Sequence, residues 1–108
     1  MILLAVPRLK SPQIMPHAGD MKTVYKYQIP LSYGGIVQMP ASAEILSLQI
    51  QDGIPCIWAK VNSEEIPSDC DFRWFGTGQP LPDNVSDMEY VGIIQYSGLV
   101  FHLFKKRP

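Results

Sequence analysis

Residues 44–61 read EILSLQIQDGIPCIWAKV, and this stretch decides the fold class. Its two apolar-rich runs flank Asp52-Gly53, and an Asp-Gly pair between alternating runs is the strongest short-range signal of a β-hairpin. The first run alternates apolar and polar residues, which predicts a strand with one face in water. The second run, residues 54–61, is apolar on both faces. We expect that strand to be covered twice, by a second sheet, a partner subunit or the N-terminal segment.

Further short strands are predicted on both sides of this hairpin. Alternating or apolar runs between Gly and Pro residues predict strands at residues 22–30, 36–39, 72–78, 90–96 and 99–105. Ser97-Gly98 predicts a second two-residue hairpin. Polar loops are expected at residues 62–71 and 79–87, with at most one helical turn beginning at Ser86. The pattern predicts an all-β fold: a small antiparallel sandwich or partly closed barrel of six or seven short strands, two tight hairpins and little or no helix.

The chain of 108 residues is long enough for one domain. We expect that domain to span residues 21–105, with a basic tail at residues 106–108. Residues 1–20 contain Pro7, Pro12 and Pro16, which forbid a stable helix. They predict an extended arm that is either disordered or an interface strand. The opening MILLAV run is too short for a signal peptide or a membrane span, so we expect no membrane association.

The composition points to binding rather than to contact with duplex DNA. Charged residues make up 18% of the chain, below the usual proportion of about 25%. A surface with few charges favours a homo-oligomer or a binding face. The net charge of −1 and the pI of about 6.0 argue against duplex nucleic acid as a partner. They are compatible with a small anionic ligand held by one or two cations.

The histidines and cysteines form no recognisable catalytic or metal motif. His17, His102, Cys56 and Cys70 lack the close ligand spacing of a zinc module. We therefore predict no metal, no cofactor and no enzymatic activity, with both cysteines as buried free thiols. The least favoured alternative is a small enzyme in which Cys56 or Cys70 works with His102.

The turn at Gly76-Thr77-Gly78 is the most specific local candidate for a ligand site. Glycines allow backbone N–H groups to converge, and such a concave nest binds anions. The alternative is an ordinary tight turn in which glycine serves only a positive φ. No GxGxxG or Walker motif accompanies the turn, so a standard nucleotide site is not indicated.

Four nearby side chains complete this predicted ligand site. Arg73 and Lys60 lie on predicted strands that we expect beside the turn, where they would supply positive charge. Trp74 or Tyr90 would offer a ring on which a base or another planar group stacks. The predicted ligand-binding residues are thus Arg73, Gly76, Thr77, Gly78, Trp74 and Lys60.

Several motifs resemble a family of small uncharacterised proteins from bacteriophages and prophages. The resemblance covers about residues 21–104, and its most specific parts are the IQDGIPCIWA hairpin and the GTGxP turn. It implies a phage origin, a location in the host cytoplasm and an accessory role, and it transfers no catalytic residue.

Three functions follow as expectations. The first is a non-enzymatic phage accessory protein that acts by binding, as an anti-defence factor that sequesters a small nucleotide-like ligand or inhibits a host protein. The second is a minor structural or assembly protein of the phage particle. The third is the Cys/His enzyme.

Overall fold

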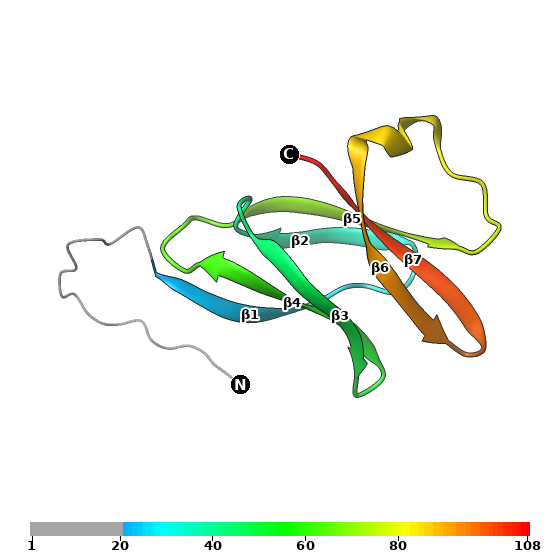
Figure 1. Cartoon of the computed structure of the whole chain (residues 1–108), viewed down its shortest axis with the longest axis horizontal. Helices are drawn as coiled ribbons and strands as arrows, with labels where there is room; N and C mark the ends of the chain where they lie inside the picture. Colours follow the sequence, from blue (N-terminus) through cyan, green and yellow to red (C-terminus); the bar gives the residue numbers. More distant parts are fainter. Residues whose placement is uncertain (1–20) are drawn as a thin grey trace.

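The computed structural model describes residues 21–108, which form seven strands and one short 3-10 helix (Figure 1). The elements are β1 (Lys22–Gln28), β2 (Gly34–Met39), β3 (Glu44–Gln51), β4 (Ile54–Asn62), β5 (Ser68–Gly76), η2 (Asp83–Asp87), β6 (Met88–Tyr96) and β7 (Leu99–Lys106). The predicted all-β, sandwich-like fold is confirmed, and the sheets do not close into a barrel. The prediction of an extended arm concerns residues 1–20, which lie outside the described residues.

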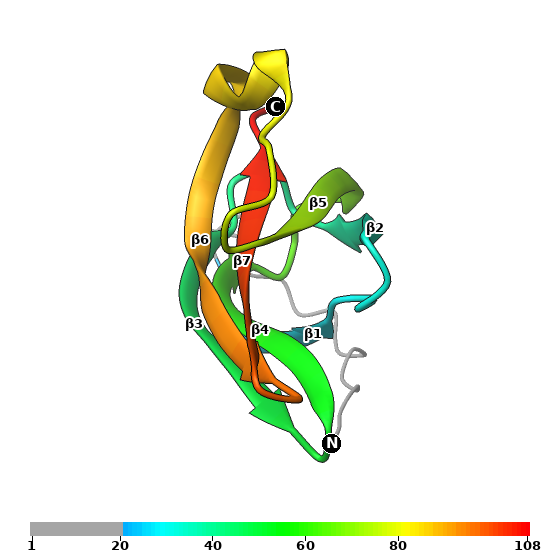
Figure 2. The same ribbon diagram turned by 90° about the vertical axis from the view of Figure 1, so that its right-hand side faces the viewer.

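The strands form two antiparallel sheets, one of three strands and one of four. The first has the order β1-β4-β3 and the second the order β2-β5-β7-β6. The two views agree that β3 lies beside β6 (Figures 1 and 2), and these strands are in contact. Gly92 of β6 lies against Leu48 of β3 at this junction. The two sheets therefore pack on one shared core.

Both predicted hairpins are confirmed. Asp52 and Gly53 have φ of 53° and 79°, and Ser97 and Gly98 have the same pair of values. Two consecutive positive φ angles define the type I′ turn, whose twist matches that of the flanking strands. The glycine at the second position of each turn therefore serves the backbone conformation directly.

Strand β4 is buried on its core face and only partly covered on the other face, where Lys60 is exposed and Trp58 is half-buried, so the expectation that it is covered twice holds only in part. Ile57, Ala59 and Val61 point into the core, while Cys56, on the opposite face, is only 1% exposed. β4 occupies the centre of its sheet, between β1 and β3. The buried core residues common to both sheets and their connections are Ile29, Met39, Ile57, Ala59, Val61, Cys70, Phe72, Trp74, Ile94 and Leu103.

The predicted loop at residues 62–71 is too long, because β5 begins at Ser68. Cys70 is buried between Asp69 and Asp71, and this alternation continues the strand. The helical turn also differs, since it spans Asp83–Asp87 and does not begin at Ser86. Arg107 follows β7 and donates its amide to the carbonyl oxygen of Asp87 at 2.9 Å.

Strand β2 begins at Gly34, earlier than the predicted residue 36. Gly34 has φ of 126°, and a Cβ there would lie 2.0 Å from the carbonyl oxygen of Phe72. Only glycine permits β2 to approach β5 this closely. In the described part of the chain, no helix has the length and apolar character to cross a membrane.

Candidate functional site

The turn at residues 76–79 follows β5, and its amides are largely occupied. The Gly76 amide donates to Oε1 of Gln79 at 2.9 Å, and the Thr77 amide donates to the carbonyl oxygen of Val100 at 3.2 Å. The Gln79 amide returns to the carbonyl oxygen of Gly76 at 3.0 Å. Gly78 has φ of 87°, which explains the glycine there. With three amides already bonded, the turn does not present the open nest that an anion requires.

The side chain of Thr77 instead contacts His102, whose two ring nitrogens are both engaged. Nε2 of His102 lies 2.8 Å from Oγ1 of Thr77, and Nδ1 lies 2.8 Å from Oη of Tyr90. A neutral imidazole donates through one nitrogen and accepts through the other, and each hydroxyl can fill either role. These bonds tie the turn after β5 to β6 and β7 and fix the plane of the imidazole ring.

Three aromatic rings extend this cluster across the sheet. Phe75 of β5 packs edge-to-face on Phe104 of β7, with ring centroids 5.5 Å apart and planes at 81°. Phe104 packs in the same way on Tyr90 of β6, at 5.2 Å and 76°. The centroid of the His102 ring lies 5.8 Å from that of Tyr90. Such perpendicular contacts suit the quadrupoles of the rings and hold them in fixed positions.

We call this surface the aromatic face; it consists of Phe75, Tyr90, Ile93, His102 and Phe104. It lies on the side of the four-stranded sheet away from the core, and none of its members belongs to the buried core. Tyr90 is 52% exposed and Ile93 is 48% exposed. The aromatic face is therefore an apolar sheet surface that remains accessible to solvent.

Arg73 borders the aromatic face and is paired with Asp71 of the same strand. Nε and Nη2 of Arg73 donate to the two carboxylate oxygens of Asp71, each at 3.0 Å. In the strand register, Arg73 faces Phe104. Both ends of this bidentate pair are partly exposed, so its contribution to stability is small. The pair places a planar guanidinium, held in one orientation, beside the rings.

Two of the predicted ligand residues lie away from the others. Trp74 points into the core, is 4% exposed and donates Nε1–H to the carbonyl oxygen of Pro30 at 2.7 Å. It therefore has no surface on which a ligand would stack. Lys60 lies on β4 in the other sheet and pairs with Glu44 at 3.1 Å. Thr77 lies in the turn between Gly76 and Gly78, and Arg73 lies earlier on β5, beside Phe104 and bonded to Asp71, away from the turn.

The cysteines do not reach His102. Cys70 is on the core side of β5 and His102 is on the outer side of β7, while Cys56 belongs to the other sheet. Burial raises the pKa of the Cys70 thiol above its ordinary value; nearby Lys105 lowers this pKa and Asp69 raises it. Within residues 21–108, no three His, Cys, Asp or Glu side chains come together as a metal site would require.

Comparison with known proteins adds one finding to this geometry. A family model described as a domain of unknown function, DUF7352, matches residues 21–108. The chain belongs to this family. The resemblance to a family without an assigned activity is thereby confirmed at that level. No curated protein and no solved structure matches the chain.

Sequence reasoning missed most of the aromatic face of this DUF7352 domain. Tyr90 is predicted as a stacking residue, whereas Phe75 and Phe104 are not singled out, and His102 is expected to be a hydrogen-bonded structural residue on the same strand face as Phe104 and not part of a binding site. Ser97-Gly98 sets a register in which His102 faces Ile93, so part of the face follows from the hairpin alone. The irregularity between Tyr90 and Gly92 then places Tyr90 beside Phe104, and no motif marks that shift.

The chemistry of the aromatic face suits recognition. It offers fixed aromatic edges, two bonded hydroxyls and an oriented guanidinium. Two cavities of the DUF7352 domain are lined by other residues, apart from Tyr90, which lines one of them. A broad surface of this kind contacts another surface more readily than it encloses a small molecule.

Proposed function

We propose that this protein acts by binding another protein on its aromatic face. The observation that carries the proposal is a set of ordered aromatic and aliphatic side chains on the outer side of the sheet, of which Tyr90 and Ile93 are exposed and the others are half-buried. Contiguous apolar patches on small soluble domains mark interaction sites more often than chance. Aromatic residues and arginine are also the types enriched at the centres of protein interfaces.

The hydrogen bonds of His102 support this proposal because they reduce the conformational entropy that the aromatic face would lose when a partner binds. Ordering flexible side chains opposes association. Here the ring of His102 is already bonded at both nitrogens, and Phe104 is already packed between Phe75 and Tyr90. A partner would meet side chains that lose little further freedom, so more of the burial energy would appear as affinity.

The geometry favours a protein over a small nucleotide-like ligand at this site. The amides of Gly76, Thr77 and Gln79 are occupied, and the Arg73 guanidinium already has a carboxylate partner. A small anion would have to share the Arg73 guanidinium with the carboxylate of Asp71, which already neutralises its charge. An apolar protein surface needs no such exchange, and its own acidic or polar groups would contact the rim of the aromatic face.

We further propose that the protein is a phage or prophage accessory factor that inhibits a host protein in the host cytoplasm. What supports this origin is the resemblance of residues 21–104 to phage and prophage proteins described above. Self-association through the same face, giving a homo-oligomer, and incorporation into the phage particle are the competing arrangements, and each predicts a different partner for the same surface.

The experiment replaces one exposed side chain on each sheet. Ile93→Glu puts a charge at the aromatic face on the edge strand β6. Val24→Glu is the matched control, since Val24 is 51% exposed and lies on the edge strand β1 of the other sheet. Both variants should fold with unchanged stability, because surface substitutions usually change it by less than about 0.5 kcal/mol.

The measurement is the native mass of protein purified from host cells, with any bound host protein identified and its affinity determined. We expect Ile93→Glu to weaken that complex at least tenfold and Val24→Glu to leave it intact. Equal affinity in both variants would contradict the proposal. A mass that is a multiple of the chain alone would assign the face to self-association, and recovery only in phage particles would favour the structural role; both results replace the host-protein proposal.

A further inference from the structure

Lys105 is a buried cation without a hydrogen-bond or ion-pair partner among the residues that the structure describes. It is 6% exposed and is the buried charged residue among those described. It lies on the core side of β7, in register with Phe72 of β5. Within residues 21–108 its ammonium makes no hydrogen bond and no ion pair. A charge removed from water in this way is costly unless an opposite charge accompanies it.

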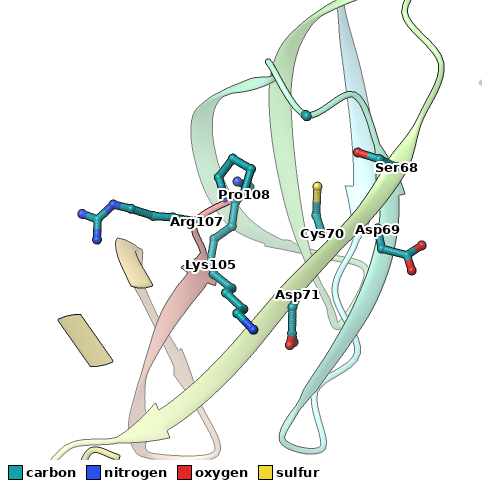
Figure 3. Close-up of a pocket in the computed structure, with 9 residues that line it drawn as sticks. Ser68, Asp69, Cys70, Asp71, Lys105, Arg107 and Pro108 are labelled. Carbon is teal, nitrogen blue, oxygen red and sulfur yellow. The ribbon is translucent and has the colours of Figure 1, made fainter. Parts of the chain in front are cut away.

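Lys105 lies between two cavities at one end of the sandwich. The smaller, of about 80 Å³, is also lined by Ser68, Cys70 and Arg107. Figure 3 shows Lys105, Cys70 and Asp71 around this cavity, with the Lys105 ammonium on the side of Asp71 and not of Cys70. The larger, of about 280 Å³, opens between β3 and β6 and is lined by Glu89 and Val91. Since one water needs roughly 10–15 Å³ of such space, each cavity has room for a group larger than a water molecule.

The acidic residues around Lys105 are committed elsewhere or lie out of reach. Asp71 is bound to Arg73, and Asp69 accepts a hydrogen bond from Gln38. Figure 3 shows the Asp69 carboxylate pointing away from Lys105. In the larger cavity, Glu44 is paired with Lys60.

Glu89 is the nearest acidic position in the register, directly across from Lys105. Its side chain is exposed and forms no ion pair with Lys105. Arg107 adds positive charge to the wall, although its Nη1 donates to the carbonyl oxygen of Ser86 at 2.8 Å. The Lys105 ammonium therefore forms no ion pair with any acidic side chain of residues 21–108.

We propose that Lys105 is the centre of a binding site for a small oxyanion, a phosphate or carboxylate group, seated in these cavities. The bound oxyanion would supply the negative charge that no side chain of residues 21–108 brings into an ion pair with Lys105. The proposal goes beyond the protein partner of the aromatic face and does not depend on it. An anionic ligand is predicted at Gly76–Gly78 from the sequence. The present proposal places such a ligand at Lys105, in another part of the four-stranded sheet.

The test observes the Lys105 ammonium directly by NMR of its Nζ resonance. Inorganic phosphate and acetate are titrated separately in the millimolar range, each against chloride at matched ionic strength. We expect the Nζ resonance of Lys105 to shift and saturate with phosphate, with acetate or with both, and not with chloride. The anion that saturates at the lower concentration identifies the source as a phosphate or a carboxylate ligand.

Lys105→Met provides the control, and Lys60→Met is its matched exposed counterpart. Methionine has a similar length and no charge, so Lys105→Met should fold with an equal or higher melting temperature in chloride buffer. Phosphate or acetate should raise the melting temperature of Lys60→Met as in the wild type and should not raise that of Lys105→Met.

Two results would overturn the proposal. One is an Nζ resonance that moves with neither anion, together with equal thermal responses in the two variants. The other is a Lys105 resonance that responds to Glu89→Gln but to no added anion, because Glu89 would then be its counter-ion.

Discussion

The outer faces of the two sheets follow the same alternation but carry different chemistry. On the three-stranded sheet, outward positions of β1 and β4 are held in polar pairs: Lys26 with Gln51 at 2.7 Å, and Lys60 with Glu44 at 3.1 Å. On the four-stranded sheet, the corresponding surface is the aromatic face. An antiparallel sheet needs one apolar face to fold and leaves the other to water. The aromatic face is a second apolar face of the four-stranded sheet that the core does not need. This is our main reason for assigning the aromatic face to binding.

The largest predicted effect separates the two sides of β5. Phe72 is fully buried in the core, whereas Phe75 is half-buried on the aromatic face. Phe72→Ala should lower the free energy of unfolding by about 3–5 kcal/mol, because it leaves a cavity as well as losing apolar burial. Phe75→Ala should cost roughly half of that or less. Urea unfolding monitored by tryptophan fluorescence measures both, and equal losses would mean that Phe75 belongs to the core.

A smaller effect compares the polar contacts of the two outer faces. His102→Leu removes the bonds to Thr77 and Tyr90 and should cost about 1 kcal/mol, since each released hydroxyl regains water. Lys60→Met breaks an exposed ion pair and should cost about 0.5 kcal/mol or less. Paired urea unfolding curves give the difference. If Lys60→Met lowered the free energy of unfolding more than His102→Leu, the result would contradict our inference that the hydrogen bonds of His102 hold the aromatic face in a fixed arrangement.

Much of the fold could be predicted because its signals are local. Both I′ turns follow from Asp52-Gly53 and Ser97-Gly98, and the burial of Ile57, Ala59 and Val61 in β4 follows from its apolar composition. In β5, alternation also carries information on the faces: Asp69, Asp71 and Arg73 share one side, which leaves Phe72 and Trp74 for the core. Reading that alternation through to its end would have placed Trp74 inside.

The candidate site was less predictable because it depends on pairing between strands. Lys60 and Arg73 occur on consecutive strands, yet β4 and β5 belong to different sheets. Because the two strands are neighbours in the sequence, nothing in the sequence indicates that Lys60 and Arg73 lie in different sheets. The burial of Lys105 was equally hidden, because a lysine near a basic tail is normally exposed and only the packing of two sheets encloses it.

The smallest predicted effect is the pH dependence due to Cys70 on the core side. Burial raises the pKa of this thiol above its ordinary value of 9.0. A raised pKa means that the folded state holds the proton more tightly than the unfolded state. The resulting stability is complete below pH 9 and is lost as pH rises through the folded pKa. Between pH 8 and pH 10, Cys70→Ala should show a shallower decline in unfolding free energy than the wild type; identical slopes would contradict this effect of burial.

The most direct test of the comparison between the two outer faces is site-specific photo-crosslinking in host cells. A photoreactive phenylalanine analogue is placed at position 93 on the aromatic face or at position 24 on the other sheet, and crosslinked proteins are identified by mass spectrometry. We predict one dominant host protein crosslinked from position 93 and none above background from position 24. Equal crosslinking from both positions, or no crosslink from position 93, would contradict the assignment of the aromatic face as the binding surface.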